Sequence, residues 1–293
     1  LHPRVRRQRQ MCIRDRFSSS PEIYDNSLQA WFKDMTNYDL SLMHFLFGAG
    51  AEMANELGIK TEAAHWNKLK SQLPDFDLDN EGSLTFAKGF PYNASHRHFS
   101  HALAIHPLGI IDWSDGEKAQ RIIRATLKKM NDYGPDYWTG YTYSWFANMQ
   151  ARAFNGEEAA KALRTFAECF CLKNTFHANG DQSASGKSKF TYRPFTLEGN
   201  FAFAAGIHEM LLQSHTGVIR VFPAVPESWK NVSFNNLRAM GGFLVSAALK
   251  DGKVVRLEIY AEKGGRLAVF SPFEHKVVEY DTQPGSRIDL AVE

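Results

Sequence analysis

We expect the chemistry of this chain at two carboxylates that lie far apart in the sequence. Glu22 follows the run Ser18-Ser19-Ser20-Pro21, and a proline after serines favours an extended, turn-like segment that holds a carboxylate rigidly without a salt-bridge partner. Glu198 stands where an apolar helical pattern begins. A helix N-terminus keeps a carboxylate ionised, which suits a base. Each glutamate is also consistent with an ordinary acidic residue at a helix start.

Histidines and an arginine form a second polar group, at Asn93–His101, which includes His96, Arg97 and His98. On a helix, His98 and His101 would share one face, but no acidic ligand follows at helical spacing. We therefore favour hydrogen-bonding histidines over a metal site. The zincin pattern, the phosphate loop, the dinucleotide fingerprint and the Gly-x-Ser-x-Gly elbow are all missing from the sequence, so no metal and no cofactor are predicted.

Aromatic residues accompany these polar groups. Trp138 and Trp145 belong to an aromatic stretch at 137–145, and Tyr192 lies just before Glu198, whose neighbour Asn200 adds an amide. Flat rings with polar edges bind sugars through C–H contacts and hydrogen bonds. An aromatic-rich core helix explains Trp145 about equally well.

The elements that must position these residues are helices followed by strands. Apolar spacing predicts helices at Tyr38–Leu57 and Thr61–Leu73, and from near Gly116, Thr142, Gly156 and Gly199 onward; a further helix is predicted over Ser95–His106. After His215 the period changes to that of short strands, as at Val218–Phe222, Phe243–Ala247, Val254–Ile259 and Leu267–Phe270. We place a boundary there, between a helical part at 17–215 and a β domain at 216–293.

Composition excludes several classes of protein. The 293 residues are 44% hydrophobic and 23% charged, which argues against disorder. No apolar stretch is long enough to cross a bilayer, so no membrane partner is predicted. The first sixteen residues carry a net charge of +5 and the remainder −3; the mildly acidic body gives no basic face for nucleic acid. Met11–Arg16 resembles the translated end of a sequencing adapter, so residues 1–16 are expected to be a non-native tail on a truncated, metagenomic fragment.

Taken in order, several segments resemble the catalytic domain of glycoside hydrolase family 95, the inverting α-L-fucosidases and α-L-galactosidases. The resemblance covers nearly everything beyond residue 17 and is most specific over 198–243. It is carried by Ser20–Glu22, His96–His101, Thr139–Tyr141 with Trp145, Leu197–Phe201, Ala205–His215, Phe222–Pro226 with Trp229, Leu237–Ala239 and Gly241–Phe243.

This resemblance implies a mainly α fold followed by β: part of an (α/α)6 barrel and a C-terminal β-sandwich-like domain. It implies a carbohydrate substrate, with Glu22 as the general acid. Glu198 occupies the position of the family's catalytic aspartate, so its longer side chain must retract to serve the same water. Residues implied or expected to bind the sugar are His98, Arg97, Asn200, Trp138, Trp145 and Tyr192.

Two other interpretations stay open. A phosphorylase on the same barrel would need basic and hydroxyl groups for phosphate, for which Ser183–Lys189 is a weak candidate. An inactive sugar-binding remnant is the non-enzyme alternative. The sequence does not distinguish fucose from L-galactose, nor does it indicate a compartment.

Overall fold

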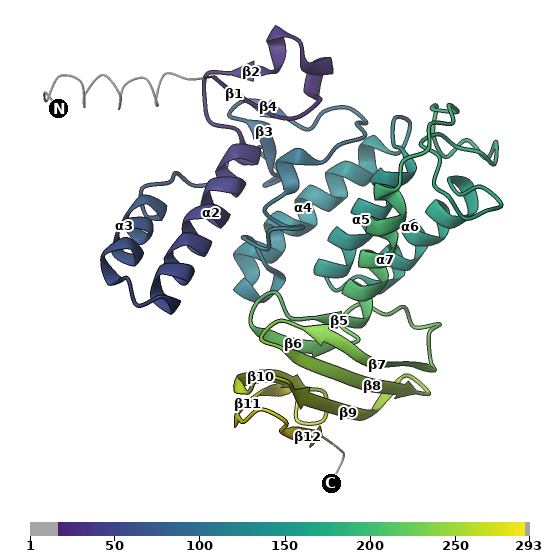
Figure 1. Cartoon of the computed structure of the whole chain (residues 1–293). Coiled ribbons are helices and arrows are strands. Elements are labelled where there is room, and N and C mark those ends of the chain that lie inside the picture. Colours follow the sequence, from purple (N-terminus) through teal and green to yellow (C-terminus); the bar gives the residue numbers. More distant parts are fainter. Residues whose placement is uncertain (1–16, 291–293) are drawn as a thin grey trace, which may run out of the picture. The chain divides into compact units, whose positions relative to one another are not determined.

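The computed structural model describes residues 17–290, and these form two compact units whose boundary lies between Pro135 and Asp136 (Figure 1). The tail predicted for residues 1–16 lies outside the described residues. Each unit is described by itself below.

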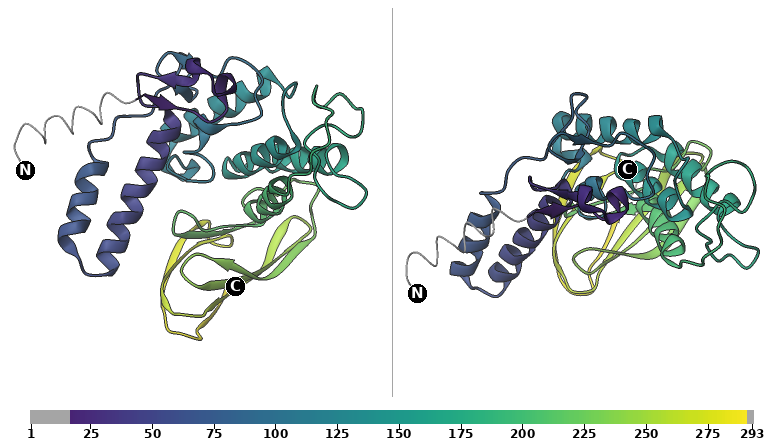
Figure 2. Two further views of the ribbon diagram at one scale, coloured as in Figure 1. Left: turned by 45° about the horizontal axis from the view of Figure 1, so that its top comes forward. Right: turned by 90° about the horizontal axis from the view of Figure 1, so that it is seen from above.

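The first unit contains a helical hairpin and a third helix. Helix α2 spans Asn37–Glu56 and packs on α3 (Lys60–Lys70), and α4 spans Glu117–Tyr133. Figure 2 shows α2 and α3 side by side as two dark blue rods. The hydroxyl of Thr36 caps α2 by accepting from the Asp39 N–H at 3.2 Å. The predicted helices at 38–57 and 61–73 are thus confirmed within a few residues.

Short strands and 3₁₀ turns complete the first unit. The strand pairs are antiparallel, β1 (Ser18–Ser19) with β2 (Trp31–Phe32) and β3 (Thr85–Ala87) with β4 (Phe90–Pro91). The 3₁₀ turns are η1 (Ile23–Asn26), η2 (Leu28–Ala30), η3 (Ser100–Ala102) and η4 (Trp113–Asp115). The Thr126 hydroxyl of α4 accepts from the Leu84 N–H at 3.0 Å, which ties the β3 segment to that helix.

The helix predicted over Ser95–His106 is wrong, because only the single 3₁₀ turn η3 forms there. The His96 side chain explains the departure. Its Nδ1 accepts from the His98 N–H at 3.1 Å, so a side chain occupies the backbone donor that a helix would use.

His101 lies in the aromatic core of this unit. Its ring is fully buried, stacks on Tyr92 at 5.1 Å between centroids and meets the edge of Phe86 at 4.7 Å. Neither ring nitrogen has a hydrogen-bond partner among the described residues. Burial, with a smaller effect from His96, lowers the pKa of His101 to about 3.

The second unit begins with a layer of three helices. Helix α5 (Gly140–Arg152) packs against both α6 (Gly156–Cys169) and α7 (Glu198–Leu211). Every α5 residue from Thr142 to Arg152 is buried. The guanidinium of Arg152 is paired there with both carboxylate oxygens of Glu209 on α7, at 2.6 and 2.8 Å.

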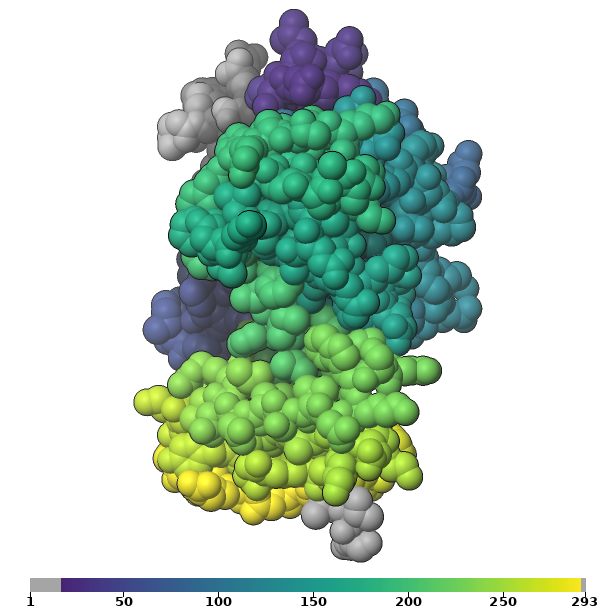
Figure 3. Space-filling model, turned by 90° about the vertical axis from the view of Figure 1, so that its right-hand side faces the viewer, coloured from purple at the N-terminus to yellow at the C-terminus, as the bar shows by residue number. Residues whose placement is uncertain are grey.

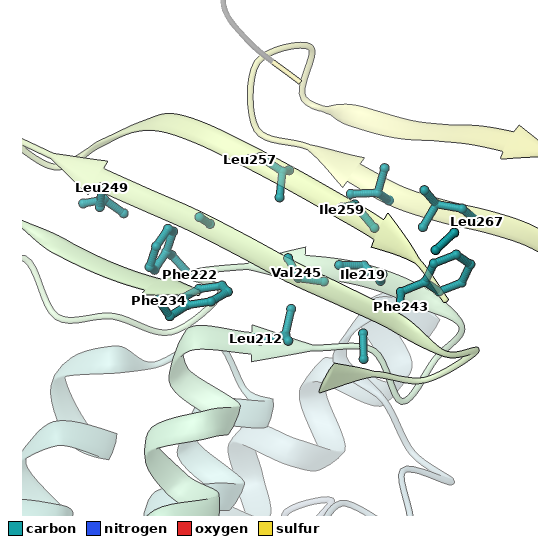
Figure 4. Close-up of a cluster of buried hydrophobic side chains, with 14 residues drawn as sticks. Leu212, Ile219, Phe222, Phe234, Phe243, Val245, Leu249, Leu257, Ile259 and Leu267 are labelled. Atoms are coloured by element: carbon teal, nitrogen blue, oxygen red, sulfur yellow. The ribbon is translucent and has the colours of Figure 1, made fainter. Parts of the chain in front are cut away.

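Two four-stranded sheets form the β domain of the second unit. One has the order β11-β10-β6-β5, and the other β12-β9-β8-β7. Their bounds are β5 Leu212–Gln213, β6 Val218–Val221, β7 Val232–Ala239, β8 Phe243–Lys250, β9 Lys253–Ala261, β10 Gly265–Ser271, β11 Lys276–Thr282 and β12 Arg287–Leu290. Side chains from both sheets fill one apolar core, for example Ile219 and Val269 from the first sheet with Val245 and Ile259 from the second (Figure 4).

The helical layer and the β domain of this unit are joined closely; their surfaces are teal to green and light green to yellow in Figure 3. A Cβ on Gly156, at the start of α6, would lie 2.4 Å from the Val225 carbonyl carbon. Gln213 Nε2 donates to the carbonyl of Ala151 at 2.9 Å. Glycine is therefore required where α6 begins, because backbone occupies the space of a side chain.

The predicted order of helices followed by strands is confirmed, and the four predicted strands correspond to β6, β8, β9 and β10. Strand β7 was missed because its register shifts between Phe234 and Leu237, where Asn236 has a φ of 55°. This bulge breaks the alternation on which strand prediction rests.

We expect His101 to weaken the fold in acid. The unfolded chain takes up a proton on this residue near pH 6.5, whereas the folded chain does so only near pH 3. Stability is therefore lost as the pH falls from about 6.5 toward 3, by about 2 kcal/mol at pH 5. Urea unfolding of His101→Phe should show a smaller loss between pH 7.5 and 5 than the unchanged chain. His65→Phe, at an exposed position of α3, is the control; equal losses in all three proteins would contradict the expectation.

Candidate active site

Glu22 is held in place by contacts between two distant segments of the first unit. The buried hydroxyls of Ser20 and Ser100 share a hydrogen bond of 2.6 Å. The Nε2 of His96 donates to the backbone carbonyl of Glu22 at 3.1 Å, which is consistent with Nδ1 serving as the acceptor for His98. The serine-proline segment and the histidine segment therefore form one structural feature.

The carboxylate of Glu22 is paired, contrary to the expectation of a carboxylate without a salt-bridge partner. Its Oε2 accepts from Arg97 Nη2 at 2.5 Å and lies 2.9 Å from His98 Nε2. Partial burial raises the pKa of Glu22, but the charges and hydrogen bonds of His98 and Arg97 outweigh it, so the pKa is lowered overall. Burial lowers the pKa of His98 more than Glu22 raises it. Near neutral pH this favours an ionised Glu22 facing a neutral His98 that donates from Nε2.

The backbone around Glu22 is unusual. Glu22, Tyr24, Asp25 and Asn26 all have φ between 49° and 59°, in the left-handed region that costs a residue other than glycine about 1–3 kcal/mol. The Asn26 side chain accepts from the Glu22 N–H at 2.9 Å and closes the turn. Strained backbone of this kind clusters at functional sites, which supports the selection of Glu22 from the sequence.

Glu198 is the first residue of α7, as the apolar pattern after it predicted. Its side chain is exposed, and Leu197 provides no side-chain cap. Burial raises the pKa of Tyr141, and the negative charge of Glu198 adds to that increase. The helix N-terminus provides a partial positive charge beside the carboxylate.

His177, which was not predicted as a site residue from the sequence, packs directly beside the start of α7. Its ring is fully buried. A Cβ on either Gly140 or Gly199 would lie 2.3 Å from a nitrogen of this ring. The ring nitrogen Nδ1 lies 2.6 Å from the Thr196 carbonyl and 2.9 Å from the Thr196 hydroxyl. Glycine at both helix starts was the available signal, because it allows a ring to pack against two backbones.

The other predicted binding residues have different surroundings. Asn200 accepts from the His177 N–H at 3.0 Å and donates to the Thr175 carbonyl at 2.9 Å, so it fixes the loop before α7 and keeps one further donor and acceptor site. Trp138 and Trp145 are both buried. Tyr192 is 41% exposed and meets Phe190 edge to face. Burial favours core packing for the two tryptophans, while Tyr192 presents its ring to solvent.

The Ser183–Lys189 segment wraps around a carboxylate of the protein itself. Asp181 accepts from the N–H and the hydroxyl of Ser183 at 2.8 and 2.6 Å, and from the Lys187 N–H at 3.0 Å. Lys189 pairs with Asp136 at 2.6 Å. The N–H and hydroxyl of Ser183 and the N–H of Lys187 are thus already bonded to Asp181, and the Lys189 ammonium is paired with Asp136.

The structure brings the predicted residues together in two groups. Glu22, Arg97 and His98 meet in the first unit, and Glu198 and Asn200 flank Gly199 in the second. Within residues 17–290, no three histidine, cysteine or acidic side chains are grouped as metal ligands. No helix in the same range is long and apolar enough to span a membrane.

Removing Arg97 should raise the pKa of Glu22, because both its charge and its hydrogen bond favour the ionised carboxyl. We expect Arg97→Gln to shift the carboxyl titration of Glu22 upward in ¹³C NMR. Arg124→Gln removes a charge of the same unit that lies over the Trp113 ring and should leave the titration unchanged. A titration of Glu22 that is the same with and without Arg97 would show that the pair has no electrostatic effect.

The sequence is similar to known proteins of one family. The sequence matches the glycosyl hydrolase family 95 catalytic domain over residues 5–211 and the family's C-terminal domain over residues 213–289. Alpha-L-fucosidase 2 of Arabidopsis thaliana is 31% identical over 232 residues, which are 77% of this chain and 27% of the relative. Probable alpha-fucosidase A of Aspergillus niger is 23% identical over 247 residues, which are 80% of this chain and 28% of the relative.

The chain therefore spans just over a quarter of the length of these curated relatives. Two matches in succession, one to each domain of the same family, account for most of the sequence. This chain belongs to glycoside hydrolase family 95.

Proposed function

We propose that this chain is part of an enzyme that removes terminal α-L-fucosyl or α-L-galactosyl residues from oligosaccharides or polysaccharides with inversion of configuration. Family membership and the names of two relatives, alpha-L-fucosidase 2 and probable alpha-fucosidase A, support the fucosyl substrate. The observation that carries the proposal is the pairing of Glu22 with Arg97 and His98.

In this proposal Glu22 is the general acid. A paired, ionised carboxylate is a poor acid, so its pKa must rise before it protonates the glycosidic oxygen. Arg97 and His98 offer a way to achieve this, because a bound sugar brings hydroxyl acceptors that compete with Glu22 for the same donors. Loss of those contacts, together with burial under the sugar, raises the pKa of Glu22. Arg97 and His98 thus bind the substrate, and by releasing Glu22 at the same time they raise its pKa.

Glu198 is the proposed base that activates water. An inverting mechanism needs acid and base about 6.5–9.5 Å apart, with the water on the opposite face of the sugar. The exposed position at the N-terminus of α7 leaves the Glu198 carboxylate accessible to water, as a base requires. His177 and Asn200 fix the segment that carries it.

The remaining proposed binding residues differ in how far their side chains are exposed to solvent. Tyr192 is the proposed sugar-contacting ring, and Asn200 offers its unused amide positions. Trp138 and Trp145 support the site from within the helical layer, since both are buried. The chemistry requires no cofactor.

We also propose that the helices at 17–215 belong to an (α/α)6 barrel and that 216–293 is the C-terminal β domain. Helix α2 carries a row of exposed apolar side chains, Leu42, Phe45, Leu46 and Met53. A helix of a closed barrel buries such a row against its neighbours.

The two alternatives receive less support. A phosphorylase needs a phosphate site, and the hydroxyls of Ser183 and Ser185 are bonded to Asp181. An inactive sugar-binding remnant would bind fucose without cleaving it. Assays of fucoside cleavage distinguish such a remnant from an enzyme.

We expect the effect of Glu22→Gln to depend on the leaving group. Protonation matters most when the departing oxygen is basic, so hydrolysis of a fucosyl oligosaccharide should fall by roughly 10²–10⁴-fold. An activated aryl α-L-fucoside, whose phenolate leaves unaided, should lose much less. ¹H NMR of the first-formed sugar would show the β anomer. Equal losses on both substrates would remove Glu22 from the acid role.

For Glu198→Gln we expect a comparable loss on both substrates, because activation of water is needed whatever leaves. Glu168→Gln, an exposed position on α6, is the matched control and should retain full activity. If Glu198→Gln retains activity on the aryl fucoside, Glu198 is structural. If neither the unchanged chain nor the control cleaves any fucoside but both bind fucose, the remnant interpretation replaces the enzyme.

A further inference from the structure

A cavity lies in the second unit, lined by residues outside the candidate catalytic groups. Its volume is about 840 Å³, which is within the roughly 300–1,000 Å³ of ligand sites and far larger than a bound ion needs. Its walls come from the end of β6 at 220–223, the β8–β9 turn at 252–254, the β10–β11 turn at 270–275, and Phe154 between α5 and α6.

The walls of the cavity are mainly flat and apolar. Phe154, Phe270 and Phe273 line it together with Pro223 and Pro272, and all five side chains remain partly accessible. Rings of this kind bind the C–H faces of a sugar. A set of rings and prolines around an open cavity therefore favours a cyclic ligand over an extended acyl chain.

Two cations stand at these walls. The Arg220 guanidinium lies 6.0 Å from the centre of the Phe270 ring, and Nη1 donates to the Thr216 hydroxyl at 3.3 Å. Lys253 is exposed at the start of β9. Within the described residues neither cation forms an ion pair with a carboxylate, which leaves most of the Arg220 donors available.

Among the described residues that line the cavity, none is acidic, and His275 adds a further polar group. Asp251 and Glu274 are neighbours in sequence but do not line it, and Glu274 is paired with Lys276 at 2.7 Å. The charge of the cavity is therefore complementary to an anion. Arg220 can take a carboxylate through two parallel hydrogen bonds.

We propose that this cavity of the β domain binds a hexuronic acid residue of a polysaccharide, with the sugar ring against the phenylalanines and its carboxylate on Arg220 and Lys253. A glycan is the occupant favoured here because the chain belongs to a family of glycoside hydrolases. The site would hold an acidic polymer independently of the catalytic residues. The inference does not depend on the roles of Glu22 and Glu198.

The test is isothermal titration of the whole chain with an unfucosylated trigalacturonate and with the neutral trigalactose. We expect the acidic sugar to bind and the neutral one to bind at least about tenfold more weakly, since a hydrogen bond to a charged group is lost. Raising the salt concentration should weaken the binding. Because neither sugar carries fucose, failure here leaves the proposed hydrolysis untouched, and failure of hydrolysis leaves this result valid.

Variants locate the binding. Arg220→Gln should lower the affinity by about tenfold or more, and Lys253→Gln, at an exposed position that the fold does not need, should lower it as well. Arg266→Gln on β10 removes the same charge at a site paired with Glu279 and should change nothing. Equal affinity for acidic and neutral sugars, equal effects of Arg266 and Arg220 substitutions, no binding at millimolar sugar, or binding of inorganic phosphate in place of trigalacturonate would each overturn the proposal.

Discussion

The imidazole of His177 is the constraint on which the position of Glu198 in the second unit depends. It fills the space where side chains at Gly140 and Gly199 would lie, and its Nδ1 donates to the Thr196 carbonyl. The start of α5, the start of α7 and the loop that precedes α7 thus meet on one buried ring. Glu198 occupies its position because the residue after it is pressed against that ring. A larger residue at either glycine would displace the start of a helix, and with it the carboxylate.

The group around Glu22 in the first unit is organised by charge, whereas the group around Glu198 in the second unit is organised by packing. Glu22 lies in a strained turn whose cost is offset by contacts with Ser100, His96 and Arg97. Arg97 both orders the turn and, together with His98, lowers the pKa of the Glu22 carboxyl. Folding and acidity of this segment are therefore coupled, and a ligand that draws the donors away changes both.

Much of the helical part could be predicted from the sequence, because apolar spacing is repeated over many residues in α2 and α4. The family could be identified from motifs around Glu198 and Gly241, and both family matches agree. The predictions that were wrong or missing concern positions where a single side chain decides the local structure. The helix predicted at 95–106 is absent where the His96 side chain accepts from the His98 N–H, and Asn236 interrupts β7. The ion pair of Glu22 joins residues 75 positions apart, so it has no local signal. The position of His177 was indicated only indirectly, by glycine at the two helix starts that its ring contacts.

The close packing of α5 and α6 on the β domain limits which parts of such a chain recombination can exchange. Gly156 packs against the backbone of Val225, and the Gln213 side chain donates to the Ala151 carbonyl near the end of α5. Recombination that exchanged only the strands would have to recreate a fit at the scale of single atoms. Shuffling is therefore expected to transfer the three helices and both sheets as one cassette, even though their secondary structure suggests two separable modules.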